Sequence, residues 1–329
     1  INGEGLMETI RNILIVAQDG RLQYEALLFA ASLRHFPENR DLRLVVAEPQ
    51  PGPLWQGDPR ISRPAIRREL RALGADIIPL HSKVFGARYP QGNKLEALAL
   101  LPTGEAFAFF DTDTLITGPI ADVVAGPPTA SVRVEPTWPR EPLYGPSLAQ
   151  IWGALYDSFG LEMALTLNTR FGADDWRRYL YFNAGWFTGA CPHQMGERLL
   201  HYAAAIERDP PPELATQTLF PWLDQIVLPL AIAAEGGGRR DTGLDGPKSL
   251  HYRALPEIYA YASDHAVDIL EQVTRAAHLW DIFNQHVAFR RMIFKENGPA
   301  LRQIIASTPP PFTYWARRKQ IMDAGYWVR

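Results

Sequence analysis

Residues 105–113, with the sequence EAFAFFDTD, form an apolar run rich in phenylalanine that ends in two aspartates. Such a run predicts a buried β-strand, and it closes a series in which strand and helix patterns alternate. We expect strands at 12–17, 42–47 and 76–80, interleaved with helices at 24–31, 66–73 and 93–101. This alternation indicates βαβ units, and therefore an α/β fold with a mostly parallel sheet and helices on both of its faces.

The chain after residue 113 has a weaker pattern. We expect strands at 127–134, 181–188 and 274–279, a loop at 135–146, and helices at 148–159, 174–180, 195–207 and 222–234. Prolines 309–311 separate two further helices near the C-terminus. We therefore predict an expression remnant at residues 1–6, one domain over 7–283 and a helical extension over 284–329.

The composition is that of a folded globular protein. Of the 329 residues, 47% are apolar and 21% are charged, which allows a sizeable core and excludes disorder over most of the chain. A net charge of −3 gives no basic surface field, so we expect no nucleic-acid partner. Because Cys191 is the single cysteine, an internal disulfide and a cysteine-based zinc cluster are excluded.

The sequence shows no recognisable targeting signal. The apolar stretches, such as 226–234, are far shorter than the roughly 20 residues of a transmembrane helix. The N-terminus also lacks a charged segment followed by an apolar one, which is typical of a signal peptide. Together with the single cysteine and a preference for arginine over lysine, these features favour a cytoplasmic bacterial protein.

The sharpest chemical feature is the triplet Asp111-Thr112-Asp113 at the end of the 105–110 strand. In extended chain, side chains two residues apart point the same way, so both carboxylates could hold one hard divalent cation. The place also fits, because ligands of parallel sheets gather at the carboxyl ends of the strands. The alternative is a helix cap or turn, for which aspartate is equally suited.

Three other stretches offer polar groups in apolar surroundings. Asn183-Ala184-Gly185 interrupts a strand pattern, and the alternative there is a β-bulge. Asp224-Gln225 begins an apolar helix, where a simple cap is the alternative. His278 ends the expected strand 274–279 and could ligate a metal or merely pack, and His251 is the other candidate ligand.

In their order along the chain, these stretches resemble the motifs of the GT-A glycosyltransferases, most closely the retaining enzymes of glycosyltransferase family 8 and their relatives. The resemblance covers roughly residues 10–283, and it includes the segment Asn93-Lys94-Leu95 before the strand. It implies a Rossmann-like GT-A fold and transfer of a sugar from a nucleotide-diphosphate sugar, with a UDP-sugar favoured, to a saccharide or other hydroxyl acceptor, with retention.

The resemblance also implies roles for particular residues. Asp111, Asp113 and His278 would bind Mn²⁺ or Mg²⁺. The donor nucleotide would contact Ala17, Asp19, Lys94, Asp111 and Thr112. The transferred sugar would contact Asn183, Ala184, Gly185, Asp224 and Gln225, with Asp224 and Gln225 as the catalytic pair.

Residues 279–284, LWDIFN, depart from the family pattern, in which Gly and then Lys-Pro-Trp often follow the histidine. The lysine that would contact the donor phosphates therefore has no counterpart at that place. Arg253 and Arg290 are the candidates to replace it.

The acceptor side offers only aromatic residues and one loop. Rings that could stack on a sugar belong to Trp138, Tyr144, Trp152, Trp186 and Trp222, although packing in the core is the alternative for each. The loop 135–146 follows the aspartate strand and is expected to form an acceptor wall or lid.

Other classes of protein remain open at this point. A phosphatase of the haloacid dehalogenase type needs a threonine where Leu115 stands. A nucleotidyltransferase needs a glycine-rich loop after the first strand, but residues 18–21 hold one glycine. A non-catalytic nucleotide-sugar-binding protein that keeps the fold is the third alternative.

Overall fold

The computed structural model describes residues 8–132, 136–306, 309, 311 and 313–329. The expected remnant at 1–6 lies outside the described residues. So do positions 133–134 of the expected strand at 127–134, position 135 of the expected loop, and Pro310.

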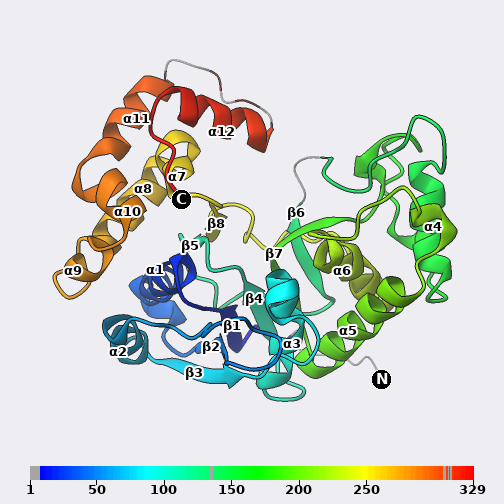
Figure 1. Ribbon diagram of the computed structural model, residues 1–329, viewed down its shortest axis with the longest axis horizontal. Coiled ribbons are helices and arrows are strands. Elements are labelled where there is room, and N and C mark those ends of the chain that lie inside the picture. The colour runs from blue at the N-terminus through cyan, green and yellow to red at the C-terminus, as the bar shows by residue number, and fades with distance from the viewer. Residues whose placement is uncertain (1–7, 133–135, 307–308, 310, 312) are drawn as a thin grey trace, which may run out of the picture.

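A six-stranded sheet with the order β3-β2-β1-β4-β7-β6 forms the centre of the molecule (Figure 1). The first four strands in this order are parallel, β7 is antiparallel to β4, and β6 is antiparallel to β7. The strands span Asn12–Val16 (β1), Arg43–Pro49 (β2), Ala75–Leu80 (β3), Phe107–Phe110 (β4), Thr129–Val132 (β6) and Phe182–Gly189 (β7). The predicted α/β class with a mostly parallel sheet is therefore confirmed.

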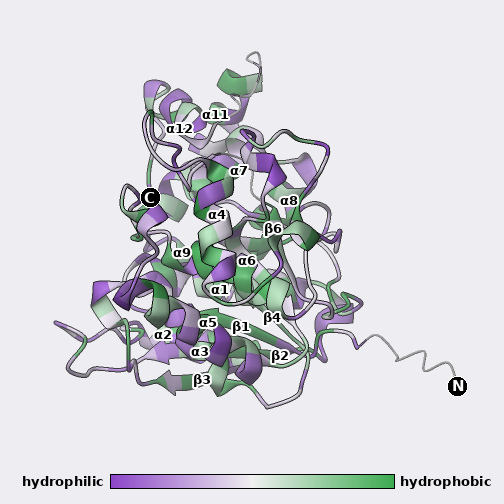
Figure 2. Cartoon of the chain, turned by 90° about the vertical axis from the view of Figure 1, so that its right-hand side faces the viewer, coloured by the Kyte–Doolittle hydropathy of each residue, from purple (hydrophilic) through white to green (hydrophobic). Residues whose placement is uncertain are grey.

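Both faces of this sheet are buried, because successive side chains of its central strands enter two different hydrophobic clusters. Ile15 and Phe110 belong to one cluster, whereas Leu14 and Phe109 belong to the other. Figure 2 shows β1 and β2 coloured mainly as hydrophobic, between helices that carry both kinds of residue. A strand that is buried on both faces reads as a continuous apolar run, which is the pattern that predicted these strands.

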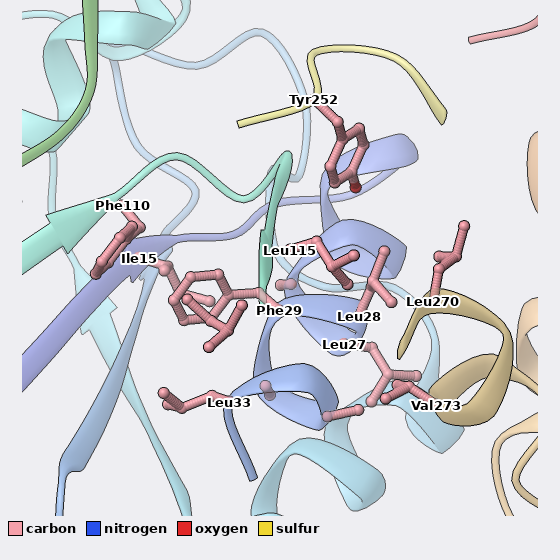
Figure 3. Packing of buried hydrophobic residues seen from close by; sticks show 14 of the residues in the cluster. Ile15, Leu27, Leu28, Phe29, Leu33, Phe110, Leu115, Tyr252, Leu270 and Val273 are labelled. Atoms are coloured by element: carbon pink, nitrogen blue, oxygen red, sulfur yellow. The ribbon is translucent and has the colours of Figure 1, made fainter. Parts of the chain in front are cut away.

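Helices cover the two faces. On the first face, Leu27 and Phe29 of α1 fill the space between the sheet and Leu270 of α8 (Figure 3). The helices with residues in this cluster include α1 (Arg21–His35), α2 (Pro64–Ala72), α7 (Leu255–Tyr261) and α8 (Asp264–Thr274). The second face is covered by α3 (Asn93–Ala97), α4 (Leu148–Asp157), α5 (Pro192–Arg208) and α6 (Leu223–Ala234).

A second, two-stranded sheet pairs β5 (Thr114–Ile116) with β8 (Ser249–His251) in antiparallel orientation. In Figure 1 the two strands lie between the central sheet and the C-terminal helices. Neither strand was predicted, because three residues are too few to show a periodic pattern. This small sheet brings residue 251 next to residue 114, directly after the aspartate triplet.

Two predicted elements are wrong. The expected strand 274–279 is the end of α8 followed by a turn, because α8 has helical periodicity in its buried residues Ala266, Ile269, Leu270 and Val273. The Ser263 side chain caps the start of that helix by accepting from the Ala266 backbone N–H. The expected helix 174–180 is only a 3₁₀ turn at Trp176–Arg178.

The C-terminal part is helical, as predicted, and α11 and α12 flank the proline run. Leu301 and Ile321 pack in the same cluster as α1, whereas the domain boundary at residue 283 stays a prediction. No helix in the described ranges is long and apolar enough to cross a membrane. The remaining helices span Trp280–Phe283 (α9), Val287–Phe289 (α10), Asn297–Ala306 (α11) and Tyr314–Asp323 (α12).

Candidate active site

The aspartate triplet lies where the two sheets meet. Asp111 directly follows β4, and Asp113 directly precedes β5. The backbone N–H of Asp111 donates to the carbonyl oxygen of Gly185 in β7 at 2.8 Å. The antiparallel pairing of β4 with β7 therefore brings the Asn183–Gly185 segment beside the triplet, as the sequence predicted for one shared site.

His251 completes a cluster with the two aspartates. Its Nε2 lies 3.1 Å from Oδ1 of Asp113, and the Tyr252 backbone N–H donates to the carbonyl oxygen of Asp113 at 2.9 Å. One ligand atom from each of Asp111, Asp113 and His251 lies within 4.8 Å of the others. A Cβ atom at position 185 would stand 2.2 Å from Nδ1 of His251, so glycine is what leaves room for the imidazole.

His278 does not join this cluster. It is exposed on the turn between α8 and α9, and the possible metal ligands in the described part of the chain group His251 with Asp111 and Asp113. The apolar residues that precede His278, which favoured it as the end of a strand, belong to the buried face of α8. The signal for His251 was the short run Leu250-His251-Tyr252, whose strand character depends on pairing with β5.

Lys94 is buried in the middle of the site, where it bridges two carboxylates. Its Nζ lies 3.0 Å from Oδ1 of Asp111 and 3.0 Å from Oδ2 of Asp224, and it donates to the carbonyl oxygen of Ala184 at 3.2 Å. Asp224 also accepts a 2.5 Å hydrogen bond from the Tyr89 hydroxyl. Asp224 is thus a buried, fully bonded group that holds Lys94 in place.

The backbone around Asn183 is fixed in an unusual geometry. Ala184 has a φ of 60°, in the left-handed region that side-chain-bearing residues seldom adopt. The Asn183 side-chain oxygen accepts from the Gly185 backbone N–H at 3.0 Å. A left-handed residue at a ligand site is a common form of stored backbone strain, and here it presents the Ala184 carbonyl to Lys94.

The two aspartates differ in their electrostatics. Burial raises the pKa of Asp111 above its ordinary value, despite the charge of Lys94. Burial also acts to raise the pKa of Asp113, but His251 and Arg21 outweigh this and hold that pKa below its ordinary value. Arg21 Nη1 is 3.9 Å from Asp113 Oδ2. The ionised form of Asp113 is therefore favoured by its neighbours, whereas the ion pair with Lys94 only partly offsets the effect of burial on Asp111.

Glu25 of α1 is a member of the site that the sequence pattern did not reveal. Its carboxylate is buried, pairs with Arg21 and accepts from the Thr112 hydroxyl at 3.3 Å. Burial, together with the charge of Asp113, raises the pKa of Glu25 to about 8. The available signal was its place directly before the apolar run 26–31, because a helix that is apolar all round is expected to be buried.

Two cavities meet at the aspartates. The first, which we call the Lys94 cavity, has a volume of about 330 Å³ and is also lined by Val16, Gln18 and Thr112. The second, the Trp222 cavity, has about 360 Å³ and is also lined by Asn183, Gln225 and His251. Asp111, Asp113 and Arg329 line both cavities.

The end of β1 contributes to the Lys94 cavity through residues other than those expected. Val16 and Gln18 line it. Ala17 is buried in the core, and Asp19 is exposed and accepts hydrogen bonds from Gln23 and Ser62. The alternation of side chains along an extended chain explains the difference, since neighbours of a cavity-lining residue face away from the cavity.

The expected sugar-stacking aromatics separate into three groups. Trp138, Trp152 and Trp186 are fully buried in the packing of the core. Tyr144 is 94% exposed. Trp222 alone of the five lines one of the two cavities in the described structure.

A comparison with protein families now defines the class of protein. The family model described as the Rhodobacterales glycosyltransferase domain matches residues 13–236, which is more than half of the chain. The chain therefore belongs to this glycosyltransferase family. It is a glycosyltransferase, so the phosphatase and nucleotidyltransferase alternatives fall away.

Solved structures give remote similarities. One is the galactosyltransferase LgtC in complex with donor and acceptor sugar analogues, with 13% identity, a TM-score of 0.43, and coverage of 82% of this chain and 99% of that one. Another is the apo form of the glycosyltransferase GlyE of Streptococcus pneumoniae TIGR4, with 14% identity, a TM-score of 0.43, and coverage of 85% and 64%. No curated protein sequence matches the chain.

Proposed function

We propose that the chain is a metal-dependent glycosyltransferase that moves a sugar from a nucleotide-diphosphate sugar, with UDP-sugars favoured, to a saccharide or other hydroxyl acceptor, with retention. The observation that carries the proposal is the cluster of Asp111, Asp113 and His251 at the junction of two cavities. A donor with a nucleoside part and a sugar part needs such a pair of adjoining spaces.

The three side chains fit a divalent cation. Two carboxylates are the oxygen ligands that Mg²⁺ and Mn²⁺ prefer, and imidazole is accepted by Mn²⁺ and other transition metals. The buried Nδ1 of His251 has no hydrogen-bond partner among the described residues, and Nε2 is the ring nitrogen that faces Asp113. A cation bound here would neutralise charge on the leaving diphosphate.

We assign the nucleoside to the Lys94 cavity and the transferred sugar to the Trp222 cavity. Gln225 lines the second cavity and is held by the Tyr181 hydroxyl, which donates to its side-chain oxygen at 3.0 Å. It is therefore the member of the Asp224-Gln225 pair that would contact the sugar. Asp224, bonded to Lys94 and Tyr89, is a positioning residue that fixes Asp111 through Lys94.

Arg329 is the cation that we assign to the donor phosphates, in place of the lysine that has no counterpart after His278. Its side chain lines both cavities, and it has no ion-pair partner within the described ranges, whereas Lys94 and Arg21 are already paired with carboxylates. A guanidinium at the junction of the nucleoside and sugar spaces is placed to bind the diphosphate that joins them.

Replacing this cation is expected to weaken donor binding. Arg329→Ala should raise the donor KM about 10- to 100-fold, because it removes one hydrogen-bonded charge. Arg329→Lys should recover part of the effect. Arg208→Ala, at an exposed position on α5, is the matched control and should behave as the native protein. Equal donor KM values for Arg329→Ala and the native chain would remove Arg329 from the diphosphate site.

The proposed function is tested by thermal unfolding with UDP-, GDP-, CMP- and dTDP-sugars, each with Mn²⁺ and with EDTA. A ligand that binds the native state raises the melting temperature by mass action. We expect a shift with one nucleotide class, dependent on Mn²⁺. A folded sample that shows no shift with any of these pairs would instead support a non-catalytic member of the family.

A further inference from the structure

A third cavity, of about 450 Å³, lies beside β6 and β7 and takes no part in the site described above. We call it the Trp176 cavity. Its volume falls in the range of small-molecule sites, which are mostly apolar and aromatic with a few polar groups. The apolar part of its wall consists of Ala130, Phe171, Trp176, Tyr179, Tyr181 and Phe182.

The charged residues of this wall are already engaged by the protein. Arg239 donates to the carbonyl oxygens of Thr166, at 3.1 Å, and Tyr179. Arg240 donates to the carbonyl oxygens of Gly126 and Val124, at 2.6 Å each. Backbone carbonyls therefore hold both guanidinium groups in place, while the buried Nε of Arg240 has no hydrogen-bond partner among the described residues.

Three other charged groups line the wall. Asp241 is exposed and accepts from the Gly243 backbone N–H at 2.9 Å. Arg177 forms an ion pair with Asp175 at 2.5 Å. Asp245 accepts from the Val132 backbone N–H at 2.6 Å and from the Trp186 indole N–H at 2.7 Å. A sugar ring needs several hydrogen-bond partners, so this cavity suits a flat apolar group better than a saccharide.

The Trp176 cavity adjoins the proposed sugar-transfer space through shared wall residues. Val132 and Asp245 line both it and a polar cavity of about 530 Å³, which we call the Glu257 cavity. That cavity in turn shares Asn183 and His251 with the Trp222 cavity. The three cavities therefore adjoin in sequence, beginning at the aspartate cluster and ending among aromatic rings.

We infer that the acceptor is a two-part molecule, with a polar hydroxyl-bearing part in the Glu257 cavity and a flat apolar part, such as an aromatic ring, in the Trp176 cavity. The inference rests on the proposed function for the identity of the first part. The second part follows from the aromatic wall and from the engaged state of its charged groups. An acceptor of this form would present its hydroxyl toward the Trp222 cavity.

The test compares 4-nitrophenyl hexosides with the matched methyl hexosides, in the gluco, galacto and manno series, by calorimetric titration of the full chain with Mn²⁺ present. We expect the aryl member of a pair to bind at least about tenfold more tightly, as the burial of an aromatic ring implies. Val132→Trp should remove this preference, because Val132 belongs to the wall shared by the two cavities. It is 54% exposed, so a larger side chain there narrows both cavities without disturbing the core. Phe171→Ala should reduce the aryl preference, because it removes one aromatic ring of the cavity wall.

Val287→Trp is the control, because Val287 is 41% exposed on α10 and lines none of the three cavities. It should keep the aryl preference. Equal affinities within every aryl and methyl pair, or an aryl preference that survives in Val132→Trp, would overturn the inference. If the inference fails but a donor raises the melting temperature in a metal-dependent way, the proposed function is still supported. If aryl binding depends on Val132 but no donor raises the melting temperature, the proposed function alone is refuted.

Discussion

Asp113→Asn is expected to abolish the metal-dependent stabilisation of the protein by its sugar donor. Asp113 is the carboxylate whose pKa lies below its ordinary value, because His251 and Arg21 outweigh the effect of burial. It therefore supplies the permanent negative charge of the cluster. With donor at about 100 times its Kd, the native protein gains about 2.7 kcal/mol from binding, and the variant should gain none of the metal-dependent part.

The measurement is the melting temperature with donor in Mn²⁺ and in EDTA. The unliganded melting temperature of Asp113→Asn should fall, because the charge interactions that hold the pKa of Asp113 below its ordinary value are lost, and the readout is therefore the difference between Mn²⁺ and EDTA. Asp268→Asn, at an exposed position on α8, serves as the control for loss of a single carboxylate. If Asp113→Asn retained the full difference between Mn²⁺ and EDTA, the metal site would have to lie elsewhere.

The second large effect concerns stability. Lys94→Met should lower the free energy of unfolding by about 3–5 kcal/mol, because it leaves the buried carboxylate of Asp224 and the half-buried carboxylate of Asp111 without their cation. Urea unfolding at neutral pH measures the loss. Adding Asp224→Asn to the Lys94→Met chain should restore part of the stability, since one of the two stranded charges is then removed.

An exposed ion pair provides the comparison. Lys319 and Asp323 lie 2.6 Å apart on α12 with both side chains well exposed, and Lys319→Met should cost less than about 1 kcal/mol. A similarly small cost for Lys94→Met would mean that the buried bridge does not hold the site together.

The sequence predicted most of the sheet because β1, β2 and β4 are buried on both faces, which produces the continuous apolar runs that mark such strands. It did not predict β5 and β8, whose three-residue length carries no period. For that reason His278 was preferred over His251. The pairing of Thr114 with His251 is a tertiary contact, and no local sequence pattern encodes it.

The site was predicted in part. The aspartate triplet, Asn183, Gln225 and Lys94 do come together. The contact of Lys94 with the nucleotide stays a prediction, and the structure adds that Lys94 bridges Asp111 and Asp224. Ion pairs between residues 130 positions apart leave no trace in a periodic pattern, since they depend on which strands end at the same edge of the sheet.

The ligand cluster draws on two separate sheets. Asp111 follows a strand of the six-stranded sheet, while His251 belongs to the two-stranded sheet that leads into the C-terminal helices. An ion held by both side chains would act as a removable cross-link between those two layers, closing a loop of the chain in the way that a structural metal does.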